Sequence, residues 1–376
     1  MSDDPTPEAD RVDGAPHPRE TRHLIGQSAA EAAFLEAYTT GRLHHGWLIT
    51  GPRGVGKATL AWRIARFLLA EAPASEAALF GAPPPPDNLD IPDDHPVARR
   101  MAALSEGRLF LLRRAWDADK KRLKAQITVD EARKLKGFFG LSAADGGRRV
   151  VIVDAADEMN VSAANALLKL LEEPPANTTL LLVSHQPSRL LPTIRSRCRE
   201  LRLATLSPDD MATALEAAGC SAEGDTAALA ELSIGAVGEA VRLTNLGGLE
   251  GYTDLVRMFT DLPGLDRARA IRLAEACAGR GAEDRLDLTI GLIETFLARL
   301  ARAGATRQTP PEAARGEAAL FARLAPDAHA ARRWADLHQS LGQEARHGRA
   351  VNLDPAALVL DMVLKIDEAA AGVAAH

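Results

Sequence analysis

A glycine-rich loop that ends in a lysine is the part of the sequence best suited to chemistry. Gly51, Gly54, Gly56 and Lys57 have the spacing G-x-x-x-x-G-K, between an apolar run and a helix-prone segment. Glycines let backbone N–H groups turn inward around an anion, the helix N-terminus adds partial positive charge, and the lysine reaches terminal phosphates. The spacing predicts a nucleotide-binding site; the alternative is a tight strand-to-helix turn without a ligand.

The residue after the lysine departs from this pattern. Magnesium binding expects Ser or Thr there, and the sequence has Ala58. Thr59 follows and is kept among the candidate cofactor-binding residues, although adjacent helical positions point about 100° apart. Hydrolysis at this site is therefore in doubt.

An acid at the end of an apolar run is the second candidate. The run Arg149 to Asp154 reads as a strand buried on both faces, with its carboxylate at the edge where ligands of open α/β sheets bind. We interpret Asp154 as the acid that would hold magnesium through water. The alternative is a strand-end aspartate that caps the next turn.

Length and composition limit the class of protein. The 376 residues predict two or three domains, and 46% apolar and 26% charged residues are ordinary for a soluble chain. A formal charge of −6 argues against a protein that coats nucleic acid by itself. Three cysteines without metal-ligand spacing favour a reduced, cytoplasmic setting, and neither a signal peptide nor a membrane span is evident.

Two stretches look irregular. Residues 1–22 are polar, acidic and proline-bearing, and are expected to be a disordered tail. Residues 71–126 are interrupted by Pro83 to Pro86 and are expected to be an insertion or mobile loop. A basic cluster lies at 99–124; a solvated face is its default interpretation, and a surface for DNA phosphates or a partner is the alternative.

The remaining pattern predicts alternating helices and strands. Capping boxes at Ser28 and Thr128 predict helix starts, as do Asn160 and Ser207. A buried strand is expected at 180–183 and a short strand at 200–203. Everything after about 219 looks helical, with one apolar stripe over 286–300. The order predicts an α/β fold with a doubly wound parallel sheet, followed by helical domains.

Three motifs make the chain resemble the AAA+ clamp-loader subunits of bacterial DNA polymerase III, over roughly residues 23–243. They are Asp154-Ala155-Ala156-Asp157-Glu158-Met159-Asn160, Asn165-Ala166-Leu167-Leu168-Lys169-Leu170-Leu171-Glu172-Glu173-Pro174-Pro175, and Leu191-Pro192-Thr193-Ile194-Arg195-Ser196-Arg197-Cys198. The resemblance implies an AAA+ P-loop domain over 23–204, a small helical lid over 205–247 and a helical collar for oligomerisation over 248–376.

The resemblance also implies roles for single residues. Arg197 matches the arginine finger that reaches ATP on a neighbouring subunit, where it would stabilise charge on the transferring phosphate. The alternative is that Arg197 is a surface arginine without a functional role. Cys198 is interpreted as a small core residue.

Departures from the family pattern limit the expected activity. The water-polarising glutamate is replaced by Ala155, and the sensor arginine by Gly238, with Arg242 four residues further on. We therefore expect a subunit that binds ATP or ADP, with magnesium if bound, but hydrolyses it weakly or not at all. The alternatives are an ATP-hydrolysing motor subunit and an autonomous P-loop ATPase or phosphotransferase.

Partners and metals follow from the same resemblance. Other clamp-loader subunits, and through them the sliding clamp and primer-template DNA, are the implied partners; no membrane partner is expected. Relatives carry a four-cysteine zinc module after the phosphate-loop helix, but residues 71–126 have no cysteine. We expect no zinc, which metal analysis of the purified protein tests.

Overall fold

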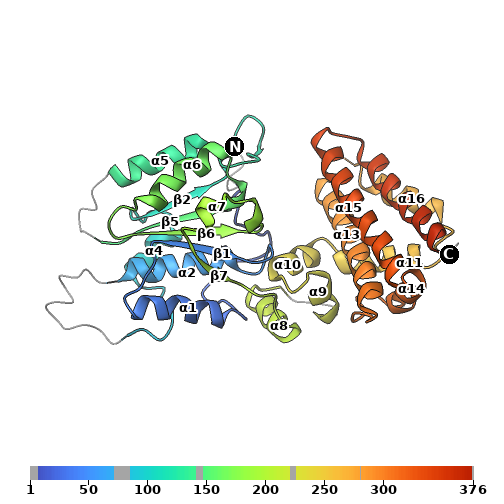
Figure 1. Cartoon of the computed structure of the whole chain (residues 1–376), viewed down its shortest axis with the longest axis horizontal. Coiled ribbons are helices and arrows are strands. Elements are labelled where there is room, and N and C mark those ends of the chain that lie inside the picture. Colours follow the sequence, from blue (N-terminus) through green and yellow to red (C-terminus); the bar gives the residue numbers. More distant parts are fainter. Residues whose placement is uncertain (1–6, 72–84, 141–146, 221–225, 280, 375–376) are drawn as a thin grey trace. The chain divides into compact units, whose positions relative to one another are not determined.

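The computed structural model describes residues 7–71, 85–140, 147–220, 226–279 and 281–374. Its contacts divide the chain into two compact units (Figure 1). The first comprises residues 1–219 and 236–239, and the second comprises residues 220–235 and 240–376. No helix in the described ranges is long and apolar enough to cross a membrane.

A five-stranded sheet forms the middle of the first unit. Its strands lie in the order β2-β5-β6-β1-β7, and every neighbouring pair is parallel. The bounds are β1 Gly46–Thr50, β2 Leu109–Arg113, β5 Arg149–Asp154, β6 Thr178–Ser184 and β7 Arg199–Arg202. Parallel strands need crossover connections, here mostly helical, so the predicted doubly wound α/β class is confirmed.

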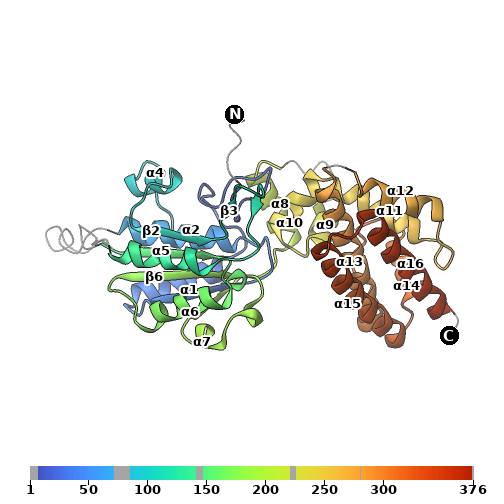
Figure 2. The same ribbon diagram turned by 90° about the horizontal axis from the view of Figure 1, so that it is seen from above.

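Helices cover both faces of this sheet (Figures 1 and 2). One apolar core lies between the sheet and α1 Ser28–Thr39, α2 Lys57–Ala70 and α4 Pro96–Ala102. The other lies between the sheet and α5 Val129–Gly140, α6 Val161–Glu172 and α7 Pro192–Arg195. Successive residues of β1 alternate between the two cores, with Trp47 and Ile49 in one and Leu48 in the other, as the period of two requires.

Two of the four predicted helix caps are confirmed. Asn160 accepts a hydrogen bond from the N–H of Ala163 at 2.8 Å, and Ser207 accepts one from Asp210 at 3.1 Å. The capping boxes at Ser28 and Thr128 are wrong. Helix α1 already includes Ser28, and the buried Thr128 hydroxyl has no hydrogen-bond partner.

The expected irregular insertion at 71–126 is wrong for much of its length. Strand β2, an edge strand of the main sheet, lies inside it, as do α4 and a hairpin of β3 Trp116–Asp117 with β4 Arg122–Leu123. Residues 72–84, where the proline run begins, lie outside the described residues. The apolar run that forms β2 is short and is flanked by arginines, so the sequence pattern does not distinguish it from the surrounding basic stretch.

The expected disordered tail is also wrong for residues 7–22, which pack against α2 and the end of β2. Asp10 accepts hydrogen bonds from Trp62 Nε1 at 3.1 Å and from Arg113 Nη1 at 2.8 Å. Burial raises the pKa of Asp10, but hydrogen bonds and charges from His17, Arg113 and Trp62 outweigh it and lower the pKa to about 2. Residues 1–6 of the predicted tail lie outside the described residues.

The helices after β7 agree with the predicted helical C-terminus. They are α8 Pro208–Ala217, α9 Thr226–Leu232, α10 Val237–Asn245, α11 Gly248–Phe259, α12 Arg267–Ala276, α13 Glu283–Thr306, α14 Glu317–Leu324, α15 Ala328–Ala350 and α16 Pro355–Ala374. The stripe over 286–300 is buried within α13. The predicted lid, 205–247, is divided between the two units, because α8 belongs to the first and α9 to the second.

Candidate functional site

The glycines of the phosphate loop adopt backbone conformations that other residues avoid. The loop joins β1 to α2, and the φ angles of Gly51, Gly54 and Gly56 are +144°, +83° and +98°. A Cβ on Gly56 would lie 2.5 Å from Leu24 Cδ1, and one on Gly54 would lie 3.0 Å from the amide nitrogen of Glu239. Both positions therefore favour glycine for conformation, and at Gly54 the nearby backbone also leaves little space for a side chain.

Lys57, the first residue of α2, is folded onto the loop itself. Its side chain is buried, and Nζ donates hydrogen bonds to the carbonyl oxygens of Gly51, at 2.8 Å, and Pro52. Burial lowers the pKa of Lys57 to about 8, although the charges of Asp154 and Asp157 oppose the shift. Lys57 and Asp154, chosen separately from the sequence, thus lie close enough to interact.

Asp154 ends β5 at the edge of the sheet that carries the phosphate loop. Its side chain is buried. Burial raises the pKa of Asp154 to about 7, and the nearby charges of Asp10 and Glu158 act in the same direction. Neutral pH therefore lies close to the titration of this carboxyl group, and a cation there would favour its charged form.

Replacing Asp154 with Asn should change how stability depends on pH. The folded pKa is above the ordinary value of 3.8, so between about pH 4 and pH 7 the folded chain holds a proton that the unfolded chain has lost. The Asp154 contribution to stability is thus lost as pH rises through this window. We expect the free energy of unfolding of Asp154→Asn, relative to that of wild type, to be higher at pH 8 than at pH 5 by up to a few kcal/mol. Urea unfolding at both pH values measures this; Asp130→Asn, on the exposed surface of α5, is the control, and an equal effect at both pH values would contradict the prediction.

Two polar groups missed in the sequence lie at the end of β6, the neighbour of β1. Ser184 Oγ and His185 Nδ1 are buried and have no hydrogen-bond partner among the described residues. The His185 amide donates to Asp157 Oδ1 at 2.9 Å. Burial lowers the pKa of His185 to about 4, and Lys57 adds to the shift, so the ring is neutral. Their place after a buried strand, at the same edge as Asp154, is the signal that could have identified them.

These groups fit a phosphate better than they fit a magnesium ion. Unpaired buried polar groups cost free energy, and a bound phosphate would provide partners for Ser184 and His185. His185 lines a cavity of about 620 Å³ together with Thr50 and Gly51. In contrast, the position next to Lys57 is Ala58, and Thr59 is buried in α2. Within the described ranges, no group of three His, Cys, Asp or Glu side chains is arranged to hold a metal ion.

Gly238, where the family pattern has a sensor arginine, contacts the phosphate loop through its backbone. Gly238 donates a hydrogen bond from its N–H to the carbonyl oxygen of Gly54 at 2.9 Å. A Cβ on Gly238 would lie 3.0 Å from Gly54 Cα. Arg242 instead brings Nη2 within 3.7 Å of the place that a Cβ would take on Gly291 in α13.

Arg197 lies at the opposite edge of the sheet. It follows α7 and precedes β7, and its carbonyl oxygen would be 3.1 Å from a Cβ on Gly46, where β1 begins. The phosphate loop follows the other end of β1, five residues on, which corresponds to roughly 16 Å. Cys198 next to it is partly buried, and burial raises the pKa of its thiol to about 12, as suits a packing residue.

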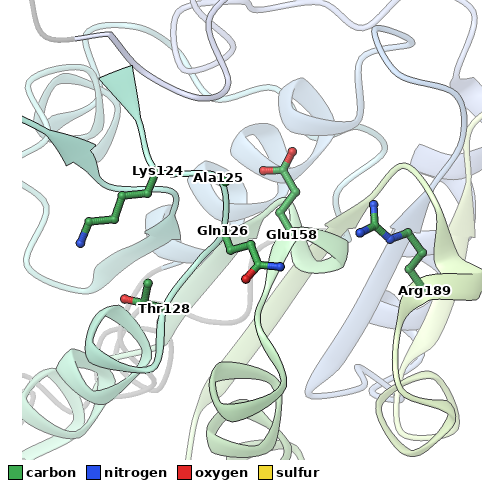
Figure 3. Close-up of a pocket in the computed structure, with 6 residues that line it drawn as sticks. All are labelled: Lys124, Ala125, Gln126, Thr128, Glu158 and Arg189. Carbon is green, nitrogen blue, oxygen red and sulfur yellow. The ribbon is translucent and has the colours of Figure 1, made fainter. Parts of the chain in front are cut away.

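The basic stretch divides into paired and exposed residues. Arg100 and Arg108 pair with Glu106, and Arg114 pairs with Glu158. Arg100 is nevertheless exposed, as are Arg99, Lys120, Lys121 and Arg122. Figure 3 shows a further cavity, of about 490 Å³, whose lining includes Lys124, Arg189 and the carboxylate of Glu158. Both interpretations of this stretch stay open.

The family profile described as "DNA polymerase III, delta subunit" matches residues 26–207. A protein named DNA polymerase III subunit delta' from Pseudomonas aeruginosa is 40% identical over 184 residues, which are 46% of this chain and 50% of that protein. The subunit of the same name from Escherichia coli is 31% identical over 213 residues, covering 56% and 57%. DNA polymerase III subunit gamma/tau of Mycobacterium tuberculosis is 28% identical over 309 residues, covering 74% and 49%.

The chain spans about half the length of the curated relatives it matches. Among solved structures, a DNA polymerase III gamma-subunit-related protein from Thermotoga maritima aligns with 90% of this chain and 99% of that chain, at 17% identity and a TM-score of 0.39. The resemblance to clamp-loader subunits that the motifs indicated is confirmed for the matched residues.

Proposed function

We propose, from the premise that residues 26–207 belong to the DNA polymerase III delta-subunit family, that this protein is a delta-prime-like clamp-loader subunit. In this role it helps to load a sliding clamp onto DNA during replication. It hydrolyses ATP weakly or not at all, and it supplies Arg197 to the ATP site of a neighbouring subunit.

The separation of Arg197 from Lys57 is the observation that carries this proposal. The two residues lie beyond opposite ends of β1, so the guanidinium cannot reach a phosphate held by its own loop. Arg197 is 38% exposed, which leaves it accessible to another subunit. A cationic side chain of this kind stabilises charge that develops on a transferring phosphoryl group.

The chain's own site supports binding more than hydrolysis. The loop amides, Lys57 and the unpaired groups at 184 and 185 can hold and orient a phosphate. Bound ATP or ADP would bring its own phosphates, and magnesium when present would be held through Asp154. The hydroxyl next to the lysine and the acid next to Asp154 are both replaced by alanine, so this chain has no group there to orient the metal or polarise water.

The purified chain should bind nucleotide without turning it over. We expect Lys57→Ala to weaken the binding of a fluorescent ADP analogue by about tenfold or more, because it removes a buried cation from the phosphate cradle. ATP turnover should stay at background in both proteins, and Lys136→Ala, an exposed lysine on α5, should leave binding unchanged. Turnover by the isolated chain that Lys57→Ala abolishes would contradict the proposal.

That same outcome would favour the second candidate, an ATP-hydrolysing motor subunit of the clamp loader. The intact glycine loop and the position of Asp154 are the observations in its favour. Partner subunits and DNA should stimulate the turnover of a motor subunit, whereas the turnover of an autonomous ATPase or phosphotransferase should not depend on them.

The partners and location are part of the proposal. We expect the chain to assemble with other clamp-loader subunits in the cytoplasm, and to meet the sliding clamp and primer-template DNA through that complex. Reconstitution with candidate subunits, followed by mass measurement of the complex, tests the assembly directly.

A further inference from the structure

Two acceptors from two helices hold the guanidinium of Arg197. Nη2 lies 3.0 Å from Glu172 Oε1 at the end of α6, and Nη1 donates to the carbonyl oxygen of Thr193 in α7 at 2.9 Å. The Arg197 and Glu172 side chains are 38% and 44% exposed. The contacts therefore fix where the guanidinium lies and still leave it open to another molecule.

The chain around Glu172 is itself well anchored. Helix α6 ends at Glu172, where the Glu173 N–H bonds to the Lys169 carbonyl at 3.0 Å and two prolines follow. The Leu171 side chain is buried in the core, and its carbonyl oxygen lies 3.0 Å from His45 Nε2. The backbone that carries the Glu172 carboxylate thus has little freedom to move.

Neighbouring positive charges increase the effect of the Glu172 carboxylate on the position of the Arg197 side chain. Arg195 and Arg199 lie two residues to either side, both exposed, and Arg199 stacks over the Trp47 ring at 5.3 Å. In the described part of the chain, Glu172 is the acid that forms an ion pair with Arg197. Without it, repulsion among three arginines would favour other positions of the Arg197 side chain.

We propose that Glu172 is a positioning residue that presets the Arg197 guanidinium for a phosphate group on a neighbouring subunit. The inference rests on the proposed function of Arg197. An ion pair this exposed shifts an equilibrium about fivefold at most, whereas a finger contact changes the rate by about 10³ to 10⁵. Glu172 is therefore too weak to lock the arginine away, but it can orient it.

The test is single-turnover, DNA-dependent ATP hydrolysis by the reconstituted complex. We expect Glu172→Gln to lower the rate about two- to fivefold without changing the affinity for ATP, because it loosens the orientation of a group that acts on the transition state. Glu173→Gln removes the adjacent exposed charge and should leave the rate unchanged. Since salt screens an exposed pair, the ratio of the wild-type rate to the Glu172→Gln rate should approach one as salt rises.

A double variant separates positioning from a general structural effect. In an Arg197→Ala background, Glu172→Gln should cause no further loss. An equal loss in both backgrounds, or a faster rate with Glu172→Gln, would overturn the inference. If Arg197→Ala slows the reaction and Glu172→Gln does not, the positioning role fails and the finger stands. If Arg197→Ala has no effect, the proposed function fails and the inference with it.

Discussion

Replacing Arg197 with alanine should slow ATP hydrolysis at the neighbouring subunit's site by about 10³- to 10⁵-fold, which is roughly 4 to 7 kcal/mol of transition-state stabilisation. The guanidinium would neutralise charge that builds up on the transferring phosphoryl group, and alanine cannot replace it. Because a clamp loader can hold several ATP sites, the measurement is a single-turnover time course of the reconstituted complex with primer-template DNA. One site should then no longer react in the fast phase, so the amplitude of that phase should fall by the amount of ATP that one site holds.

Arg195→Ala is the matched control, because Arg195 is an exposed arginine two residues away with a similar local charge. It should leave the time course unchanged. Both variants should assemble as wild type does, which mass measurement of the complex checks. An unchanged fast phase in an assembled Arg197→Ala complex would remove the finger assignment and leave Arg197 as a surface arginine.

A buried charge network in the second unit gives the other large effect. Glu317 is 1% exposed and accepts hydrogen bonds from Tyr252, from Arg299 Nε at 2.9 Å and from the Ala313 N–H at 2.7 Å. Arg299 also pairs with Glu231 at 2.8 Å. The network joins residues of four helices, α9, α11, α13 and α14.

We expect Glu317→Gln to lower the free energy of unfolding of this unit by about 3 to 5 kcal/mol. Removing one partner of a buried pair leaves the other charge without full compensation in a medium that solvates it poorly. This corresponds to a melting temperature lower by roughly 10 °C for a unit of this size. Urea and thermal unfolding followed by circular dichroism measure both quantities.

Glu275→Gln provides the comparison, because Glu275 is exposed on α12 of the same unit and should change stability by less than about 0.5 kcal/mol. Adding Arg299→Met to Glu317→Gln should cost less than the sum of the single changes, since both members of one pair are then removed. A loss below about 1 kcal/mol for Glu317→Gln alone would show that the network contributes little.

The three departures from the family pattern at the chain's own site differ in physical consequence. Ala58 and Ala155 remove groups that hydrolysis needs, while the backbone of the loop stays intact. Gly238 adds a contact, because its N–H bonds to the Gly54 carbonyl oxygen and its missing side chain lets the two backbones approach closely. A side chain at this position would require the backbone at Gly238 to move away from Gly54. The Gly238 backbone therefore supports the phosphate loop.

The local sequence was sufficient to predict the elements that have a strong apolar pattern or a specific motif. Strand β5 has the predicted bounds, Arg149–Asp154, and the glycine loop lies between β1 and α2 as its spacing required. These predictions succeed because an uninterrupted apolar run can be buried only between two layers, and because G-x-x-x-x-G-K needs backbone conformations that its neighbours in the chain provide. Capping was less predictable: Asn160 and Ser207 act as caps, but Ser28 and Thr128 do not.

Contacts between distant segments decided the rest. Residues 7–22 look disordered by composition, yet their acids are held by Trp62 and Arg113, which are about fifty and a hundred positions away in the chain. Strand β2 is recognisable only as the partner of β5, because the apolar run is too short to indicate a strand and the hydrogen bonds to β5 define it.

The sequence by itself determined which residues this protein has for phosphate chemistry: a glycine cradle, Lys57, Asp154 and a lone Arg197, without the hydroxyl and the acid that hydrolysis needs. Only the tertiary structure decided that they do not form one site. Parallel strands bring residues that follow them to one edge of the sheet and residues that precede them to the other, so Lys57 and Asp154 meet while Arg197 is held by Glu172 at the far edge. A motif records residue types and spacing along the chain, and whether residues at the ends of different strands meet depends on the direction in which those strands pair.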